Sequence, residues 1–204
     1  MNLFENIPGL FGSPIEIIAA LFGTVSVYLS VRQNIWSWPT AIVNVGMYTV
    51  VFYHSRLFAD MGLQVVYLII SVYGWYEWLY GGKGHTELHV SRTSRRLGTL
   101  LVGIGIVSSF VLGAGLYRTT DAAPFVDAAT TSTSLIAQWM MTKKLLENWV
   151  VWVAVDVVYI GLYIYRDLYV TAGLYLIFLI LSIMGYRQWK ASLGEKELVP
   201  APAV

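Results

Sequence analysis

The sequence contains no cysteine, and Lys, Arg, Asp and Glu together make up only 12% of its 204 residues. The absence of cysteine excludes disulfide bonds, thiolate catalysis and zinc or iron–sulfur sites built on cysteine. The scarcity of charge, combined with 57% hydrophobic residues, is typical of membrane proteins and not of soluble domains. The amino-terminal segment also lacks the basic stretch of a cleavable signal, so we expect the first hydrophobic segment to be retained.

Apolar segments recur along the whole chain, each near the roughly 20 residues that cross about 30 Å of hydrocarbon. Seven membrane-spanning helices are predicted, over residues 14–31, 36–53, 59–80, 97–117, 124–142, 146–165 and 168–189. They leave no room for a soluble domain. The sequence therefore predicts an all-α polytopic membrane protein in a single membrane domain, residues 1–204, that ends in a cytoplasmic tail over residues 190–204.

Basic residues are distributed unevenly between the two predicted sides of the membrane. The side of the amino terminus receives Arg56, Arg118 and Arg166. The opposite side receives Arg32, Lys83, Arg92, Arg95, Arg96, Lys143, Lys144, Arg187, Lys190 and Lys196. By the positive-inside rule, the carboxyl terminus is predicted to be cytoplasmic and the amino terminus to be outside.

An internal repeat relates two parts of the chain. Residues 36–78 align with residues 147–189 without a gap, and this alignment brings tryptophans and glycines into register. The matched pairs include Trp38 with Trp149, Gly74 with Gly185, Trp78 with Trp189, and Gly62 with Gly173. Apolar helices align easily with one another, but this register indicates duplication. We predict two parallel three-helix repeats, 14–80 and 124–189, with a packing linker at 97–117, an arrangement that transporters use with substrate bound between the halves.

Asp156 is the acidic residue that needs an explanation. It lies about ten residues into its predicted span, where an ionised carboxylate costs at least about 2.5–3.5 kcal/mol. Helical spacing places Trp149, Trp152 and Tyr159 on the same face. No Lys or Arg lies in the interior of a predicted span, so the partner is water, a hydrogen-bond donor or an arriving cation. Either the acid holds two helices together, or it faces a cationic ligand among aromatic rings.

Other polar and aromatic residues allow two interpretations. Asn44 and Gln64 either hydrogen-bond neighbouring helices or line a cavity. For the tryptophans near span ends we expect interfacial belts, and these are Trp36, Trp38, Trp78, Trp139 and Trp189. Asp127 follows a proline at the start of a predicted span, where we expect a capping or first-turn role.

Several classes of protein are excluded or disfavoured. The last span has no lysine before Lys190, so a retinal Schiff base is excluded. The HExxH, GxSxG and P-loop patterns are absent. His85 and His89 could ligate a metal only if helical, and they fall in a predicted loop. We therefore predict no catalytic residue, metal or cofactor, and keep an intramembrane enzyme and a scaffold or receptor as alternatives.

The combination of "LQVVY", "GWYEW", "PFVDA" and "KLLENWVVW" closely resembles the Pnu vitamin transporters, whose best-known branch takes up nicotinamide riboside. The resemblance covers essentially all the predicted spans. It implies a three-plus-one-plus-three helix fold similar to the SWEET sugar transporters, and a homotrimer. It also implies facilitated diffusion across the plasma membrane without a coupling ion, and a cytoplasmic kinase that traps the vitamin for NAD synthesis. The expected partners are a small cationic vitamin and membrane lipids, with no nucleic acid.

The resemblance further implies a binding site. The paired tryptophans of the family correspond to Trp149 and Trp152, and its amide positions correspond to Asn44 and Gln64. We expect the tryptophans to stack on the vitamin ring while Asp156 neutralises its charge. The remaining residues expected in the site are Tyr48, Tyr67 and Tyr159.

The identity of the vitamin stays open at one position. Some riboside-transporting members of the family carry asparagine where this chain has Asp156. Thiamine is also cationic and is therefore an alternative, whereas neutral riboflavin would gain less from a carboxylate. We expect phosphorylated substrates to be rejected because no basic side chain lines the predicted cavity. Gly62 and Gly173 are predicted close-packing or hinge points for a rocking motion of the two repeats.

Overall fold

The computed structural model describes residues 14–197 except 55, 57, 118–123 and 166. Seven α-helices account for most of these residues: α1 (Pro14–Val31), α2 (Ser37–His54), α3 (Phe58–Tyr80), α4 (Arg95–Leu116), α5 (Pro124–Thr142), α6 (Asn148–Tyr165) and α7 (Tyr169–Glu197). Within this part of the chain the only β-type pairing is an isolated bridge between Ser91 and Leu145. The prediction of an all-α fold with seven helices is confirmed.

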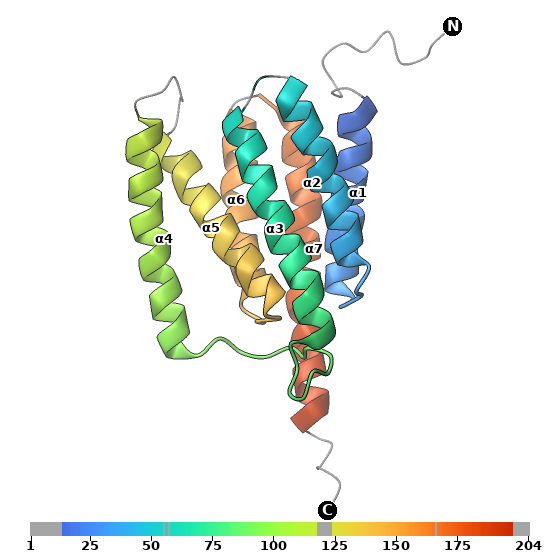
Figure 1. Cartoon of the computed structure of the whole chain (residues 1–204). Helices are drawn as coiled ribbons and strands as arrows, with labels where there is room; N and C mark the ends of the chain where they lie inside the picture. The colour runs from blue at the N-terminus through green and yellow to red at the C-terminus, as the bar shows by residue number, and fades with distance from the viewer. Residues whose placement is uncertain (1–13, 55, 57, 118–123, 166, 198–204) are drawn as a thin grey trace, which may run out of the picture.

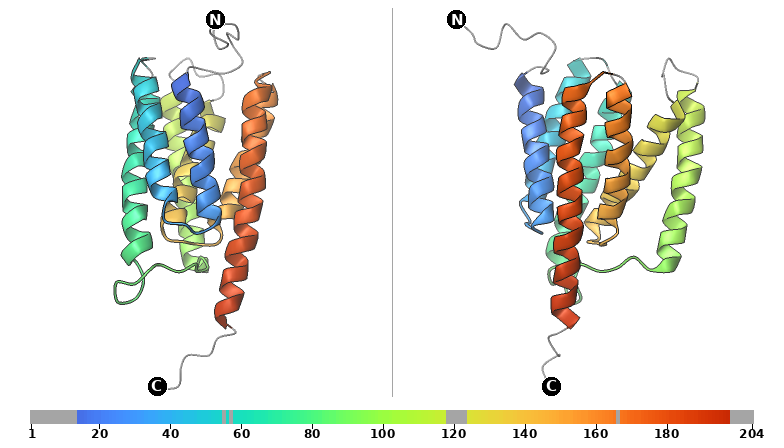
Figure 2. Two further views of the ribbon diagram at one scale, coloured as in Figure 1. Left: turned by 90° about the vertical axis from the view of Figure 1, so that its right-hand side faces the viewer. Right: turned by 180° about the vertical axis from the view of Figure 1, so that it is seen from behind.

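The helices run alternately in opposite directions within one bundle (Figure 1). We call the end at which α1 begins the N-terminal side, and the opposite end, where α7 finishes, the C-terminal side. We call α1–α3 the first unit and α5–α7 the second unit; they meet where α1 packs on α7 and α3 packs on α5. α4 stands at the outer edge and packs on α5 (Figures 1 and 2).

The helices differ in how apolar they are. By length and composition alone, α1, α4, α6 and α7 are each able to cross a membrane. α2, α3 and α5 carry more polar side chains and lie alongside these four in the bundle (Figure 2). Two of these three helices, α3 and α5, pack on each other where the units meet.

The observed helices agree with the predicted spans to within two residues at every end but one. The exception is α7, which continues to Glu197, eight residues beyond the end of the predicted span at residue 189. Polar residues end the apolar span here, but residues 190–197 contain no proline and mostly good helix formers, so the helix itself continues. Arg118 and Arg166, two of the residues in the charge comparison, lie outside the described residues.

Equivalent turns have the same backbone conformation in the two units. Gln33 after α1 and Lys144 after α5 have φ angles of 54° and 47°. Arg56 after α2 and Asp167 after α6 have φ angles of 58° and 59°. A left-handed residue just beyond a helix turns the chain away from the helix axis and ends it. Both pairs are related by the shift that aligns the two repeats, so equivalent helices in the two units end in the same way.

Two tryptophan rings occupy the space beside two glycines. Trp38 of α2 lies directly against Gly74 of α3, and Trp149 of α6 lies against Gly185 of α7. A Cβ atom at either glycine would overlap the neighbouring ring. The absence of a side chain at Gly74 and Gly185 is therefore what allows α2 and α3, and likewise α6 and α7, to pack closely.

Four tryptophans form a chain of ring contacts through the core. We call them the tryptophan cluster: Trp38, Trp78, Trp189 and Trp149. The ring centroids are 5.3 Å apart within each unit and 5.9 Å apart between Trp78 and Trp189, where the units meet. All four side chains are at most 2% exposed. The expected membrane-interface position of Trp38, Trp78 and Trp189 was therefore wrong, because these rings pack against glycine and against one another instead.

Two of the four indole N–H groups in the cluster donate hydrogen bonds across the boundary between the units. Trp78 Nε1 of the first unit donates to the Met141 carbonyl of the second, at 3.0 Å. Trp189 Nε1 of the second unit donates to the Ser30 carbonyl of the first, at 3.1 Å. Ser30 and Met141 are themselves equivalent positions of the repeat. Each unit thus supplies one donor and one acceptor at matching places.

Polar side chains add contacts between the units on the C-terminal side. Lys143 Nζ lies 2.8 Å from Glu77 Oε1 and also bonds to Tyr73. Partial burial lowers the pKa of Lys143, but the bonds to Glu77 and Tyr73 outweigh it, so its pKa lies above the ordinary value. On the other flank, Gln33 Nε2 donates to Ser192 Oγ at 3.1 Å. The two units are therefore held together on their C-terminal side.

Gly62 and Gly173 are not close-packing positions. Apart from the neighbouring residues and backbone of its own helix, no described atom lies within 4 Å of a Cβ built at either glycine. The predicted close packing was therefore wrong, and the role of Gly62 and Gly173 as hinges remains a prediction. The linker α4 also packs less than expected, because it contacts only α5 among the other described helices. Its glycines approach α5 most closely at Gly113, which lies against the Phe125 ring.

We expect Gly185→Val to destabilise the protein because the new side chain must displace the Trp149 ring. Overpacking of this kind costs roughly 1–3 kcal/mol. Thermal unfolding in detergent would measure the change. Gly173→Val, in the same helix but facing open space, is the matched control and should unfold near the wild-type temperature. Equal unfolding temperatures for the two variants would contradict the packing described here.

Candidate functional site

The Asp156 carboxylate lies in the middle of the bundle. It stands on α6, about 12 Å along the axis from the start of that helix, and is only 3% exposed. Ser182 of α7 donates a hydrogen bond to Asp156 Oδ2 at 3.0 Å. Among the described residues, Oδ1 accepts no hydrogen bond. The acid therefore has one neutral protein donor and one oxygen available to a further donor or cation.

Aromatic rings gather on the N-terminal side of Asp156. Tyr159 and Tyr163, one turn apart on α6, stack with centroids 5.8 Å apart. Tyr175 of α7 lies 4.7 Å from Tyr159 and 5.2 Å from Tyr163, and its ring meets Phe178 edge-on. Such faces carry negative quadrupole potential, which favours a positively charged group beside them. We call Tyr159, Tyr163 and Tyr175 the tyrosine cluster.

Helices of both units reach this cluster. Tyr67 of α3 interacts with Ser134 of α5 and lies close enough to Tyr159 for that residue to act on it electrostatically. Tyr159 in turn interacts with Thr130 of α5. Asp127 belongs to the first turn of α5, as expected, and acts on Tyr159 from the N-terminal side. α3, α5, α6 and α7 therefore converge around the tyrosine cluster.

The two predicted stacking tryptophans are placed differently. Trp149 is 1% exposed, and its ring contacts Gly185 and Trp189, so it packs in the core in this conformation. Its Nε1 has no hydrogen-bond partner within the described residues. Trp152, one turn closer to Asp156, is partly buried against the edge of the core. Trp152 is thus better placed than Trp149 to present a ring face to a ligand.

The predicted residues of the first unit are not all brought to Asp156. Asn44 Nδ2 donates to the Ala19 carbonyl of α1 at 2.6 Å, which matches the helix-packing interpretation. Tyr48 stacks on Phe52 of its own helix, with centroids 5.8 Å apart. Gln64 lies on α3, three residues before Tyr67, and is partly exposed. Of these residues, Gln64 is nearest along the chain to the residues that interact across the units.

Sequence reasoning left Ser182, Tyr163 and Tyr175 out of the site. A position-by-position comparison of the two repeats supplies the signal that could have found this region. Ser182 matches Ser71, which is buried too, but Asp156 matches Val45. The packing residues are thus duplicated, whereas the acid occurs in one copy only. An acid that is buried where the other repeat has a buried valine points to a role other than the packing that the two repeats share.

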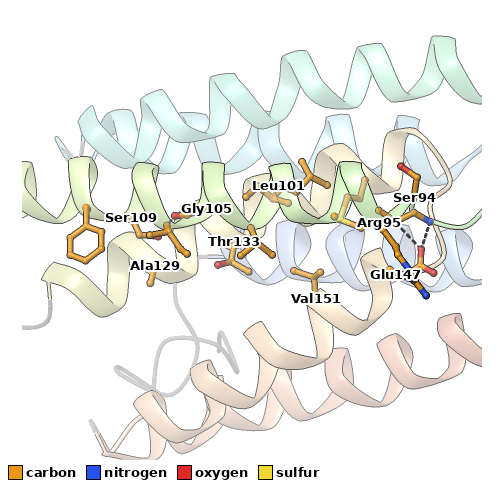
Figure 3. Close-up of a pocket in the computed structure, with 16 residues that line it drawn as sticks. Ser94, Arg95, Leu101, Gly105, Ser109, Ala129, Thr133, Glu147 and Val151 are labelled. Carbon is orange, nitrogen blue, oxygen red and sulfur yellow. Dashed lines mark hydrogen bonds between the residues drawn. The ribbon is translucent and has the colours of Figure 1, made fainter.

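A large cavity lies away from this acid. It has a volume of about 690 Å³ and is lined by α4, α5 and the start of α6 (Figure 3). Neither Asp156 nor the tyrosine cluster lines it. Its lining is mostly apolar, and its one carboxylate, Glu147, already accepts two hydrogen bonds from Thr93, so we place the candidate site at Asp156.

His85 and His89 lie in the exposed loop between α3 and α4, as predicted. His54 is the last residue of α2. Among the described residues, no group of three His, Asp or Glu side chains is arranged to hold a metal ion.

Comparison with known proteins identifies the family. The family model described as nicotinamide mononucleotide transporter matches residues 13–191. The nicotinamide riboside transporter PnuC of Escherichia coli (strain K12) is 24% identical, with 96% of this chain and 94% of that protein aligned. The riboflavin/roseoflavin transporter RibM of Streptomyces davaonensis is also 24% identical, over 85% of this chain and 83% of that protein. A crystal structure of the vitamin B3 transporter PnuC shares the fold, with a TM-score of 0.71, 23% identity, and 89% and 82% coverage.

We expect Ser182→Ala to destabilise the protein, because the buried Asp156 carboxylate loses its protein donor. Loss of a hydrogen bond to such a group costs roughly 1–3 kcal/mol. Ser71→Ala is the matched control, since Ser71 is equally buried at the equivalent position but faces no acid. Thermal unfolding should separate the two variants. A loss of stability in Ser71→Ala as large as in Ser182→Ala would show that the Asp156 contact contributes nothing specific.

Proposed function

Because the chain belongs to the nicotinamide mononucleotide transporter family, we propose that it carries nicotinamide riboside across the plasma membrane by facilitated diffusion. The observation that supports this substrate most directly is the buried Asp156 carboxylate beside the tyrosine cluster. The E. coli and Neisseria mucosa relatives are named as nicotinamide riboside transporters. The family is one of transporters, so the alternatives of an intramembrane enzyme and of a scaffold or receptor are not retained.

The charge of the riboside fits this site. Its pyridinium ring is flat and positively charged, and Asp156 offers an oxygen without a protein donor. The faces of Tyr159 and Tyr175, and of Trp152 on the C-terminal side, would stabilise the ring by cation–π contact, worth about 2 kcal/mol or more when water is excluded. The ribose hydroxyls would bond to polar groups of the first unit and α5, with Gln64 and Tyr67 as the nearest donors and acceptors.

The remaining residues of the predicted site have supporting roles in this proposal. Trp149 holds α7 against α6 and thereby fixes Trp152 and Asp156 in position. Asn44 and Tyr48 would come into contact with the ligand only after α2 moves, because Asn44 is bonded to α1 in this conformation.

A phosphate group would not be accommodated. Neither Asp156 nor the rings around it has a lysine or arginine nearby in the interior of the helices. A mononucleotide would bring its phosphate into this acidic and aromatic surrounding without a basic partner, at a large desolvation cost. We propose that the riboside, and not its phosphate, is carried. Phosphorylation by a cytoplasmic kinase would then trap it for NAD synthesis.

Transport would follow from rocking of the first unit (within residues 14–80) against the second (124–189), with 97–117 as the linker and 190–204 at the cytoplasmic end. Closure of the C-terminal side by the tryptophan cluster supports an outward-facing state. This assignment uses the positive-inside rule, with the amino terminus outside and the carboxyl terminus in the cytoplasm. Gly62 and Gly173 would serve as hinges for this rocking motion. We also propose that the protein forms a homotrimer, on the basis of the family resemblance.

The experiment that tests the substrate is a calorimetric titration of the purified protein. We expect nicotinamide riboside to bind to the wild type. Asp156→Asn should lower the affinity for the riboside roughly 10- to 100-fold, because a charge-assisted interaction contributes about 1.5–3 kcal/mol. The reduced riboside, which has nearly the same shape but a neutral ring, is the matched ligand and should bind both proteins equally. Binding of the oxidised riboside that is unchanged in Asp156→Asn would contradict the charge-pairing role.

Thiamine and riboflavin are the competing ligands in the same titration. Thiamine is cationic, so Asp156→Asn should also weaken its binding. If thiamine alone bound tightly, the substrate would be thiamine and not nicotinamide riboside. Riboflavin is neutral, and the similarity to RibM makes it the second competitor. Its binding in place of the riboside, with no response to Asp156→Asn, would overturn the proposed substrate.

A further inference from the structure

The residues that line the cavity beside α4 extend along this helix (Figure 3), which stands at the outer edge of the bundle (Figure 1), so the cavity is an elongated groove. Its walls are apolar side chains of α4 and α5, with Val151 of α6 below them: Leu101, Val102, Ile106, Phe110, Ile136 and Met140. Small residues, including Gly98, Gly105 and Ala129, leave the space between these walls. The groove is therefore a long apolar cleft between α4 and the adjoining helices α5 and α6.

The groove faces the region where lipid is expected. α4 packs on α5 alone among the described helices, and its other side chains are largely exposed, with Val107 at 64% and Phe110 at 66%. From Leu101 to Phe110 the groove extends about 14 Å, at roughly 1.5 Å per residue. That length is about half of the roughly 30 Å hydrocarbon core. The apolar part of the groove thus matches the depth of one leaflet.

The C-terminal end of the groove is polar and basic. Arg95, at the first turn of α4, lines it, and Arg92 and Arg96 are exposed nearby. Figure 3 shows Arg95 and Glu147 at this end, beyond the apolar walls. Glu147 is the one acidic residue in the lining, and its Oε2 atom accepts bonds from both the backbone N–H and the hydroxyl of Thr93, each at 2.7 Å. Positive charge therefore predominates there.

We propose that this groove binds a phospholipid with an anionic headgroup. One acyl chain lies along α4 between Leu101 and Phe110, and the headgroup phosphate lies beside Arg95. Basic pockets between membrane helices on the cytoplasmic side recognise anionic headgroups by this combination of charge and apolar depth. The positive end of the α4 dipole points to the same place. The bound lipid fills the gap between α4 and the second unit.

A second copy of the chain fits the groove less well. A helix about 10 Å wide would occupy on the order of 1,100 Å³ over about 14 Å of length. The groove has about 690 Å³, and its narrow floor is lined by small residues. An acyl chain is thinner and flexible, and it needs no polar partner inside the apolar part.

The test compares thermal unfolding in nanodiscs of phosphatidylglycerol and of phosphatidylcholine with identical acyl chains, and counts retained lipids by native mass spectrometry. We expect the wild type to unfold several degrees higher in phosphatidylglycerol and to retain that lipid. Arg95→Gln should lose this preference, while Lys83→Gln, an exposed charge in the preceding loop, should keep it. Soluble glycerol phosphate should have no effect.

A second, independent test fills the groove with a larger side chain. Gly98→Leu places a side chain in the groove and should abolish lipid retention while Arg95 is still present. Gly103→Leu makes the same change on α4 outside the groove lining and should retain the lipid. Equal stabilisation by the two lipids, or an equal effect of soluble glycerol phosphate, would overturn the proposal. It would also be overturned if Gly98→Leu still retained the lipid, or if α4 of a second copy could be crosslinked into the groove.

Discussion

The packing of Trp38 on Gly74 and of Trp149 on Gly185 is the interaction on which the rest of the structure depends. It draws α2 to α3 and α6 to α7, and it positions Trp78 and Trp189 to meet where the units join. The two exchanged indole hydrogen bonds then fix the register of one unit on the other. Each contact is worth only about 0.5–1.5 kcal/mol, so the C-terminal side is closed by several modest interactions that a rocking motion could break and re-form.

The closed C-terminal side also determines where a ligand can bind. The core hydrophobic cluster is built around the four tryptophans, which fill the bundle below Asp156. The tyrosine cluster lies above this acid, towards the N-terminal side. A nearly symmetric frame therefore carries an asymmetric site, because Val45 occupies the position equivalent to Asp156 and is buried as an ordinary apolar residue. The residues that the two units share provide the packing, and we propose that the acid found in one unit alone contacts the ligand.

Most of the fold could be predicted from the sequence because hydrophobic spans and their breaks determine where membrane helices begin and end. The end of α7 could not, since a helix continues past the membrane when its polar residues are good helix formers. The burial of Trp38, Trp78 and Trp189 was missed because a tryptophan near a span end looks the same whether it faces the interface or a glycine on the next helix. The same limit applies to Trp149 and Asn44, whose partners lie on other helices. Asp156 was recognisable because an acid at mid-membrane is costly wherever its partner lies.

The most direct test of this account is an experimental structure of the protein with nicotinamide riboside bound. The account predicts the pyridinium ring within contact distance of the Asp156 carboxylate, with Trp152 and the tyrosine cluster against its faces and Trp149 still packed on Gly185. A ring bound away from Asp156, in the groove beside α4 or against the first unit alone, would contradict the central claim that this unduplicated acid forms the substrate site.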